Sequence, residues 1–136
     1  MKFTSFKNWL NESVSTIKID GYDLPFVVIP KEKWAEGKKD PTEFDGDNSV
    51  VRVRSDYDYI KDPINWMRHE LIHYMMHKKG IKDDGKDYPM NNTEVRAYTY
   101  QFKEFKKQGV KSLEDIIDKM GKRHHEQILK KYWDQA

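Results

Sequence analysis

Alternating hydrophobic and polar positions near the start of the chain predict a β-hairpin. Ile17 and Ile19 flank a lysine, and an Asp-Gly pair separates them from an apolar run over residues 25–29. Apolar runs on either side of an Asp-Gly pair are typical of a hairpin turn. The spacing predicts a connection that reaches Leu24, with Pro25 at an edge or at the beginning of the second strand.

A further strand is predicted after a long polar stretch. Residues 31–48 are mostly polar and contain Gly37, Pro41 and Gly46, which predicts a loop with one helical turn near Trp34. In the next segment, residues 50–54, two valines alternate with two arginines. This period of two predicts a strand with one exposed face.

The second half of the chain has helical periodicity. A helix is predicted over residues 63–78, because Asp62 is a suitable N-cap, Pro63 suits the first helical position and Gly80 suits the end. After a polar loop at residues 81–89, further helices are predicted over 93–107, 112–120 and 122–133. Helices that follow a small sheet predict an α+β fold in a single domain over residues 1–136.

Composition narrows the classes of function. The chain has 136 residues, of which 37% are hydrophobic and 13% aromatic, so aromatic side chains must supply much of the core. The 25 basic and 23 acidic residues are interspersed, unlike the one-sided basic excess of a nucleic-acid-binding protein. No apolar run approaches the ~20 residues of a membrane span, and no secretory signal is expected. The absence of cysteine excludes disulfides and Cys-based metal sites and fits a cytoplasmic location.

The main candidate for chemistry is an HExxH motif on the helix predicted over residues 63–78. His69 and His73 are separated by four residues, so they lie on one helical face and can share one Zn²⁺. Glu70 projects along the same rim, where it reaches a water as general base without binding the metal. The three residues fall beside the predicted core stripe, which comprises Ile64, Met67, Leu71 and Met75.

Glu94 is the expected third metal ligand. It lies 21 residues after His73 and heads the inward face of the helix predicted over residues 93–107. That face also carries Val95, Tyr98, Phe102 and Phe105. A carboxylate on a buried face needs a partner. The alternative is that Glu94 only caps its helix, because Asn91 precedes it at capping-box spacing.

We do not expect the remaining histidines to be metal ligands. His77 is one turn beyond His73, too far along a straight helix to join the same metal easily, so we expect it beside the site or lining the cleft. His124 and His125 are adjacent and should diverge by about 100° on a helix, as solvated or partly packed side chains.

The site also needs a hydrogen-bond donor to stabilise the transition state. Tyr98, Tyr74, Tyr88 and His77 are the candidates. Tyr98 is preferred because it shares a helical face with Glu94.

The stretch from residue 49 to 105 resembles gluzincin-type zinc peptidases with a minimal fold. His69-Glu70-Leu71-Ile72-His73-Tyr74-Met75-Met76-His77 is similar to the HELxHxxxH pattern of ImmA/IrrE-like peptidases, and Glu94-Val95-Arg96-Ala97 is similar to their downstream E-x-x-A helix start. The resemblance implies a small zincin-like domain with His69, His73 and Glu94 as zinc ligands and Glu70 as general base. Ile72 stands where many relatives have glycine.

Residues 1–12 allow two interpretations. Phe3, Phe6 and Leu10 recur at helical spacing, which predicts a short amphipathic helix that packs on the domain. The segment also resembles the leader of internal head proteins of large tailed bacteriophages, because Leu10-Asn11-Glu12 fits their L/I-x-E processing site. That resemblance implies packaging in a virion and delivery into a host bacterium.

These features together predict a zinc metalloendopeptidase. Zn²⁺ lowers the pKa of water and polarises the scissile carbonyl, while Glu70 transfers protons. The strand over residues 50–54 is expected to pair with an extended peptide, with Arg52 and Arg54 favouring acidic substrates. Two alternatives remain: an inactive zincin that binds a phage or host protein, and a phage structural or host-interaction protein whose HExxH motif is incidental.

Overall fold

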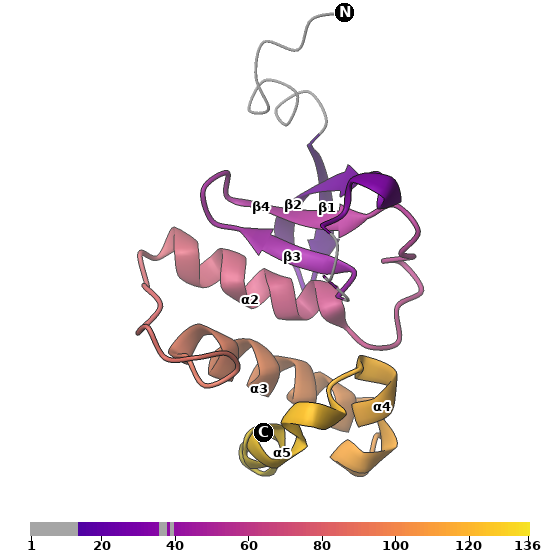
Figure 1. Ribbon diagram of the computed structural model, residues 1–136, viewed down its shortest axis with the longest axis vertical. Coiled ribbons are helices and arrows are strands. Elements are labelled where there is room, and N and C mark those ends of the chain that lie inside the picture. The colour runs from indigo at the N-terminus through magenta and orange to yellow at the C-terminus, as the bar shows by residue number, and fades with distance from the viewer. Residues whose placement is uncertain (1–13, 36–37, 39) are drawn as a thin grey trace, which may run out of the picture.

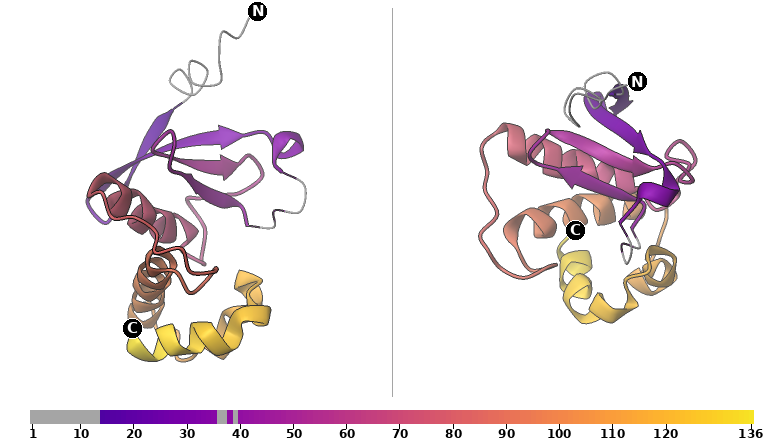
Figure 2. Two further views of the ribbon diagram at one scale, coloured as in Figure 1. Left: turned by 60° about the vertical axis from the view of Figure 1, so that its left-hand side comes forward. Right: turned by 45° about the horizontal axis from the view of Figure 1, so that its top comes forward.

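A sheet and successive helical layers make up the protein. The computed structural model describes residues 14–35, 38 and 40–136. In it a four-stranded sheet lies on helix α2, α2 lies on α3, and the C-terminal helices cover the far side of α3 (Figures 1 and 2). The predicted α+β class is confirmed, whereas the predicted helix over residues 1–12 lies outside the described residues. No helix in the described ranges has the length and apolar character needed to cross a bilayer.

The predicted hairpin is present with a shorter connection. Strands β1 (Ser15–Ile19) and β2 (Tyr22–Ile29) are antiparallel, with Ile19 opposite Tyr22. Asp20 and Gly21 have φ values of 51° and 86°, as a two-residue type I′ turn requires, so the predicted connection to Leu24 is wrong. Pro25 lies inside β2, on a stretch that pairs only with β1, and a strand with one neighbour tolerates proline.

The loop predicted over residues 31–48 contains a strand. After a 3₁₀ turn, η1 (Lys31–Lys33), next to Trp34, the chain forms β3 (Thr42–Asp45). The predicted strand is confirmed as β4 (Val50–Arg54), which is parallel to β2 and antiparallel to β3. The order β1-β2-β4-β3 makes the sheet mixed, with β4 in its interior and β3 at an edge.

Helix α2 (Trp66–Lys78) begins later than predicted. Its N-cap, Asn65, has a φ of 64° and makes no side-chain cap hydrogen bond. Asp62 nevertheless accepts hydrogen bonds from the backbone N–H groups of Ile64 and Trp66, at 2.7 and 2.8 Å. Asp62 therefore orders a turn that precedes the helix. The helix ends as predicted, with Gly80 at a φ of +75°.

Helix α2 is buried on two faces because it lies between the sheet and α3. Met67 and Leu71 pack against sheet residues such as Leu24 and Val53. Trp66, adjacent to Met67, instead joins a second cluster with residues of α3 and the C-terminal helices. The sequence predicted one core stripe on this helix, and the structure has two.

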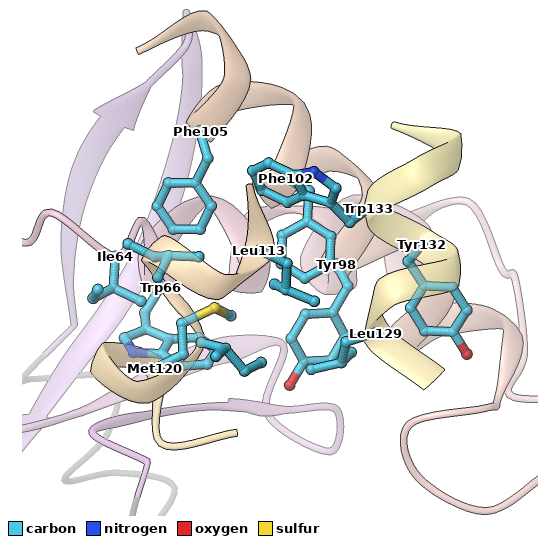
Figure 3. Close-up of a cluster of buried hydrophobic side chains, with 12 residues drawn as sticks. Ile64, Trp66, Tyr98, Phe102, Phe105, Leu113, Met120, Leu129, Tyr132 and Trp133 are labelled. Atoms are coloured by element: carbon cyan, nitrogen blue, oxygen red, sulfur yellow. The ribbon is translucent and has the colours of Figure 1, made fainter. Parts of the chain in front are cut away.

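The second cluster is largely aromatic. Helix α3 (Asn92–Lys107) supplies Tyr98, Phe102 and Phe105, none of which is exposed (Figure 3). The C-terminal elements that cover it are η2 (Leu113–Asp115), α4 (Ile117–Met120), η3 (Arg123–His125) and α5 (Glu126–Gln135). The two predicted C-terminal helices are thus each split, with a 3₁₀ turn before the α-helix. The aromatic content does supply this part of the core.

Candidate metal centre

Three side chains from α2 and α3 converge on one point. His69 Nε2 and His73 Nε2 are 3.3 Å apart, and they lie 3.0 and 2.6 Å from Glu94 Oε1. Among the described residues, this trio is the group of His, Asp or Glu side chains whose ligand atoms cluster tightly enough to hold a metal ion. The structure therefore brings together the three residues expected as ligands.

Glu94 was expected either to bind a metal or to cap its helix, and in the structure Asn91 provides the cap. Asn91 caps α3, and its side-chain oxygen accepts a hydrogen bond from the Glu94 backbone N–H at 2.9 Å. The Glu94 carboxylate does not complete a capping box but faces the two histidines. The cap fixes the first turn of α3, and with it the direction of the carboxylate.

Burial and mutual contact shift the pKa values within this trio. Burial alone lowers the pKa of His69, but the Glu94 carboxylate, together with Glu70 and Gln101, outweighs burial and the pKa is raised. Burial raises the pKa of Glu94, but contacts with both histidines outweigh it and hold the pKa well below its usual range. The carboxylate of Glu94 is consequently ionised at neutral pH and available as an anionic ligand.

Glu70 is buried next to the trio but is not part of it. It is 5% exposed, and Thr42 of β3 donates a hydrogen bond to its Oε2 at 2.7 Å. Burial raises the pKa of Glu70, while the nearby histidines and the Thr42 hydroxyl partly offset that rise. A carboxylate with a raised pKa accepts and releases a proton more readily near neutral pH.

A cavity of about 350 Å³ opens over these residues. His69, Glu70, His73 and Glu94 line it together with β3 and the loop before α3. Its other charged lining residues are Asp40, Glu43 and Asp83, all acidic.

The arginines of β4 lie elsewhere. Arg52 contacts Glu43 at 3.4 Å, and Arg54 contacts Asp56 at 2.5 Å. Neither lines the cavity, so the position on which the expected preference for acidic substrates depended is wrong.

His77 lies beside the site rather than in it. Its ring is exposed and packs edge-on against Phe44 of β3, with ring centroids 5.4 Å apart. It belongs neither to the trio nor to the cavity lining, so of its two expected places His77 takes the one beside the site and does not line the cleft. Phe44 in turn stacks on His73, at an interplanar angle of 9°, so β3 braces this histidine.

The three tyrosines considered as hydrogen-bond donors differ in their position relative to the cavity. Tyr98 is fully buried, and its ring lies 4.4 Å from that of His69. Its hydroxyl is hydrogen-bonded to that of Tyr88, which is 42% exposed, and both residues line the cavity. Burial raises the pKa of both phenols, so each keeps its proton as a hydrogen-bond donor. Tyr74 packs against Phe44 and does not line the cavity.

His124 and His125 do not diverge as predicted. They belong to the 3₁₀ turn η3, and their ring centroids are 4.1 Å apart. His125 also packs edge-on against Tyr88, at 5.3 Å. His125 therefore supports Tyr88, while His124 is exposed.

Two residues that contact the site, Thr42 and Gln101, were not found from sequence. Gln101 of α3 is fully buried, with its Oε1 3.1 Å from His69 Nδ1. A signal for it was present, because it is a glutamine on a largely aromatic inward helix face, seven residues after Glu94. Thr42 had a weaker signal, the alternation of Thr42 and Phe44 around a charged residue.

Comparisons with protein-family models, with curated protein sequences and with solved structures found no match to this chain. The resemblance to zinc peptidases therefore depends on the motif residues alone.

Proposed function

We propose that this protein is a zinc-dependent peptidase with a zincin-like fold. The observation that carries the proposal is the convergence of His69 Nε2, His73 Nε2 and Glu94 Oε1 beside a separate buried carboxylate, Glu70. Two imidazoles and one carboxylate are the ligand set of many catalytic zinc sites. A purely structural site would need a fourth protein ligand, and this trio leaves that position open to the cavity.

The donor set fits zinc with a small adjustment. Tetrahedral zinc with bonds of about 2.0–2.2 Å holds neighbouring donors roughly 3.3–3.5 Å apart. The two imidazole nitrogens are 3.3 Å apart, whereas Glu94 Oε1 lies 3.0 and 2.6 Å from them. The carboxylate would retreat by less than ~1 Å, a shift within reach of a side-chain rotation. The ion would supply Lewis-acid polarisation of a carbonyl and a lowered pKa of water.

Glu70 would then transfer the protons of peptide hydrolysis. Its Oε2 is held by the Thr42 hydroxyl, so Oε1 is the atom left to take a proton from the attacking water and to deliver it to the leaving amine. The raised pKa of Glu70 suits both steps near neutral pH.

The Tyr88–Tyr98 pair is the proposed donor to the developing negative charge. Tyr88 is the more exposed residue of the two, and Tyr98 lies in the aromatic core. Tyr98, preferred from sequence, would act by direct hydrogen bonding or by fixing Tyr88.

Strand β3 offers a place for an extended peptide. Thr42, Glu43 and Phe44 line the cavity, and among the described residues β3 pairs with β4 alone. An extended substrate can add to such an edge through backbone hydrogen bonds. The expectation that residues 50–54 perform this role is wrong, because β4 has a neighbour on each side.

The proposal is tested by zinc content and by cleavage of a quenched fluorescent peptide library. Wild type should hold about one zinc per chain, and His73→Ala and Glu94→Ala should lose it. Glu70→Gln should keep the zinc and lose cleavage by roughly 10²-fold or more. Glu32→Gln makes the same chemical change at an exposed position and should behave like wild type.

Each failure has its own meaning. A reconstituted wild type without zinc would refute the metal site. Stoichiometric zinc with no Glu70-dependent cleavage would instead favour a binding module.

A further inference from the structure

We infer that Gln101 is a positioning residue that holds His69 in the tautomer able to bind zinc through Nε2. The inference rests on the metal site of the proposed function and does not depend on the substrate. It assigns a role to a buried polar side chain that belongs neither to the ligand trio nor to the proton-transfer groups.

The orientation of the Gln101 amide is fixed by its partners. Its Nε2 donates a hydrogen bond to the Ile64 carbonyl oxygen at 2.7 Å, and a carbonyl oxygen can only accept. Its Oε1 therefore faces His69 Nδ1, at 3.1 Å, as an acceptor. Gln101 is 0% exposed, so the amide has no solvent to turn towards.

This acceptor determines where the His69 proton lies. Because Oε1 can only accept, His69 Nδ1 must carry a hydrogen and donate it. A neutral imidazole with its hydrogen on Nδ1 has a lone pair on Nε2. That lone pair points to Glu94 Oε1 and His73 Nε2, at 3.0 and 3.3 Å.

These three atoms need a positively polarised group between them, which in the metal-free protein is a histidine N–H that donates to Glu94. A metal ion at that point satisfies all three, and Gln101 thus prepares the ring for it in advance. Ligating histidines generally donate their other ring N–H to an acceptor of this kind, and loss of the acceptor typically lowers metal affinity by about 10–100-fold.

A neutral acceptor also suits the local charge. Glu70 and Glu94 are already buried at the site, with exposed fractions of 5% and 7%. When both are ionised, their two negative charges match the charge of one divalent ion. A carboxylate in the place of Gln101 would add an unmatched buried charge, whereas an amide orients the ring without one.

The test measures zinc affinity by competition with a chromophoric chelator for wild type, Gln101→Met and Gln127→Met. Methionine has nearly the volume of glutamine and a similar helix propensity, but it offers no comparable acceptor. Gln101→Met should raise the Kd for zinc by roughly 10–100-fold while still binding one ion at saturation. Gln127→Met, at an exposed position on α5, should leave the Kd unchanged. Gln101→Glu keeps an acceptor oxygen and should bind zinc more tightly than Gln101→Met.

A spectroscopic measurement separates positioning from mere structural support. In ¹⁵N-labelled, zinc-loaded wild type, two-bond ¹H–¹⁵N correlations should show His69 with its hydrogen on Nδ1 and the metal on Nε2. The opposite assignment would overturn the inference without any variant, as would an unchanged Kd in folded Gln101→Met. Either result would leave the proposed function standing. A wild type that binds no zinc would remove both.

Discussion

Replacement of Thr42 by valine tests whether β3 holds the buried general base. The change keeps the shape of the side chain but removes the hydroxyl that donates to Glu70 Oε2 at 2.7 Å. Thr42 and Glu70 are 4% and 5% exposed, so water cannot easily replace the lost donor. An unsatisfied buried group of this kind costs about 1–3 kcal/mol. Valine regains a little through its higher strand propensity, so we expect a net loss of about 1–2 kcal/mol.

The assay is urea unfolding of the metal-free protein at pH 7. The matched control is Thr99→Val on α3, where the hydroxyl donates to the Val95 backbone carbonyl at 2.6 Å. Such a bond duplicates one that the helix already supplies, so its loss should cost less than about 0.5 kcal/mol. Equal free energies of unfolding for Thr42→Val and Thr99→Val would refute the reasoning.

A double-mutant cycle isolates the interaction. In a Glu70→Gln background the acceptor is neutral, and hydrogen bonds to charged groups are roughly twice as strong as neutral ones. The cost of Thr42→Val should therefore fall by about half in that background. An unchanged cost would mean that Thr42 stabilises β3 rather than Glu70.

Three further predictions concern stability. Hydrogen bonding to Arg68 outweighs burial and lowers the pKa of Asp20. This pair therefore stabilises the fold above the unfolded-state pKa of ~3.9, and that stabilisation is lost as pH falls through the folded-state pKa. In urea unfolding between pH 6 and 3, Asp20→Asn should lose stability less steeply than wild type. Gly80→Ala should lower the free energy of unfolding by about 1–2 kcal/mol in chemical denaturation, because a φ of +75° disfavours any residue with a Cβ. An added Cβ would meet no atom within 4 Å, so the cost is one of backbone conformation alone. Equal stability of Gly80→Ala and wild type would contradict this prediction. Phe102→Ala should cost about 3–5 kcal/mol in the same assay, since the ring is 0% exposed at the centre of the aromatic cluster, and a loss under 1 kcal/mol would show that the site collapses around the deletion.

The sequence predicted those parts of the fold that depend on local patterns. Gly80 and Asn91 mark helix ends through backbone conformation and capping, so they could be identified without neighbours. Strand β3 has only four residues, and a glutamate and an aspartate interrupt its apolar pattern, so it was assigned to a loop. Its pairing with β4 is a short hairpin in which Asp45 lies opposite Val50, but the charged residues of β3 hid the strand from a search for alternating apolar positions.

The site residues likewise divide into those that local sequence patterns identify and those that only tertiary packing brings together. His69, Glu70 and His73 are close in sequence, and one helical period relates them. Glu94 could be added because a carboxylate on an inward helix face needs a partner. Thr42 and Gln101 contact these residues across 28 and 32 positions of the chain. Only the packing of α2 between two layers brings them there.

The two-sided burial of α2 also has a consequence for local dynamics. Trp66 belongs to the cluster shared with α3 and the C-terminal helices, while its neighbour Met67 belongs to the cluster shared with the sheet. Opening either half of the domain would expose one face of the same helix. We therefore expect the α2 amides to exchange hydrogen with solvent only when the whole domain unfolds, and the two halves to act as one cooperative unit.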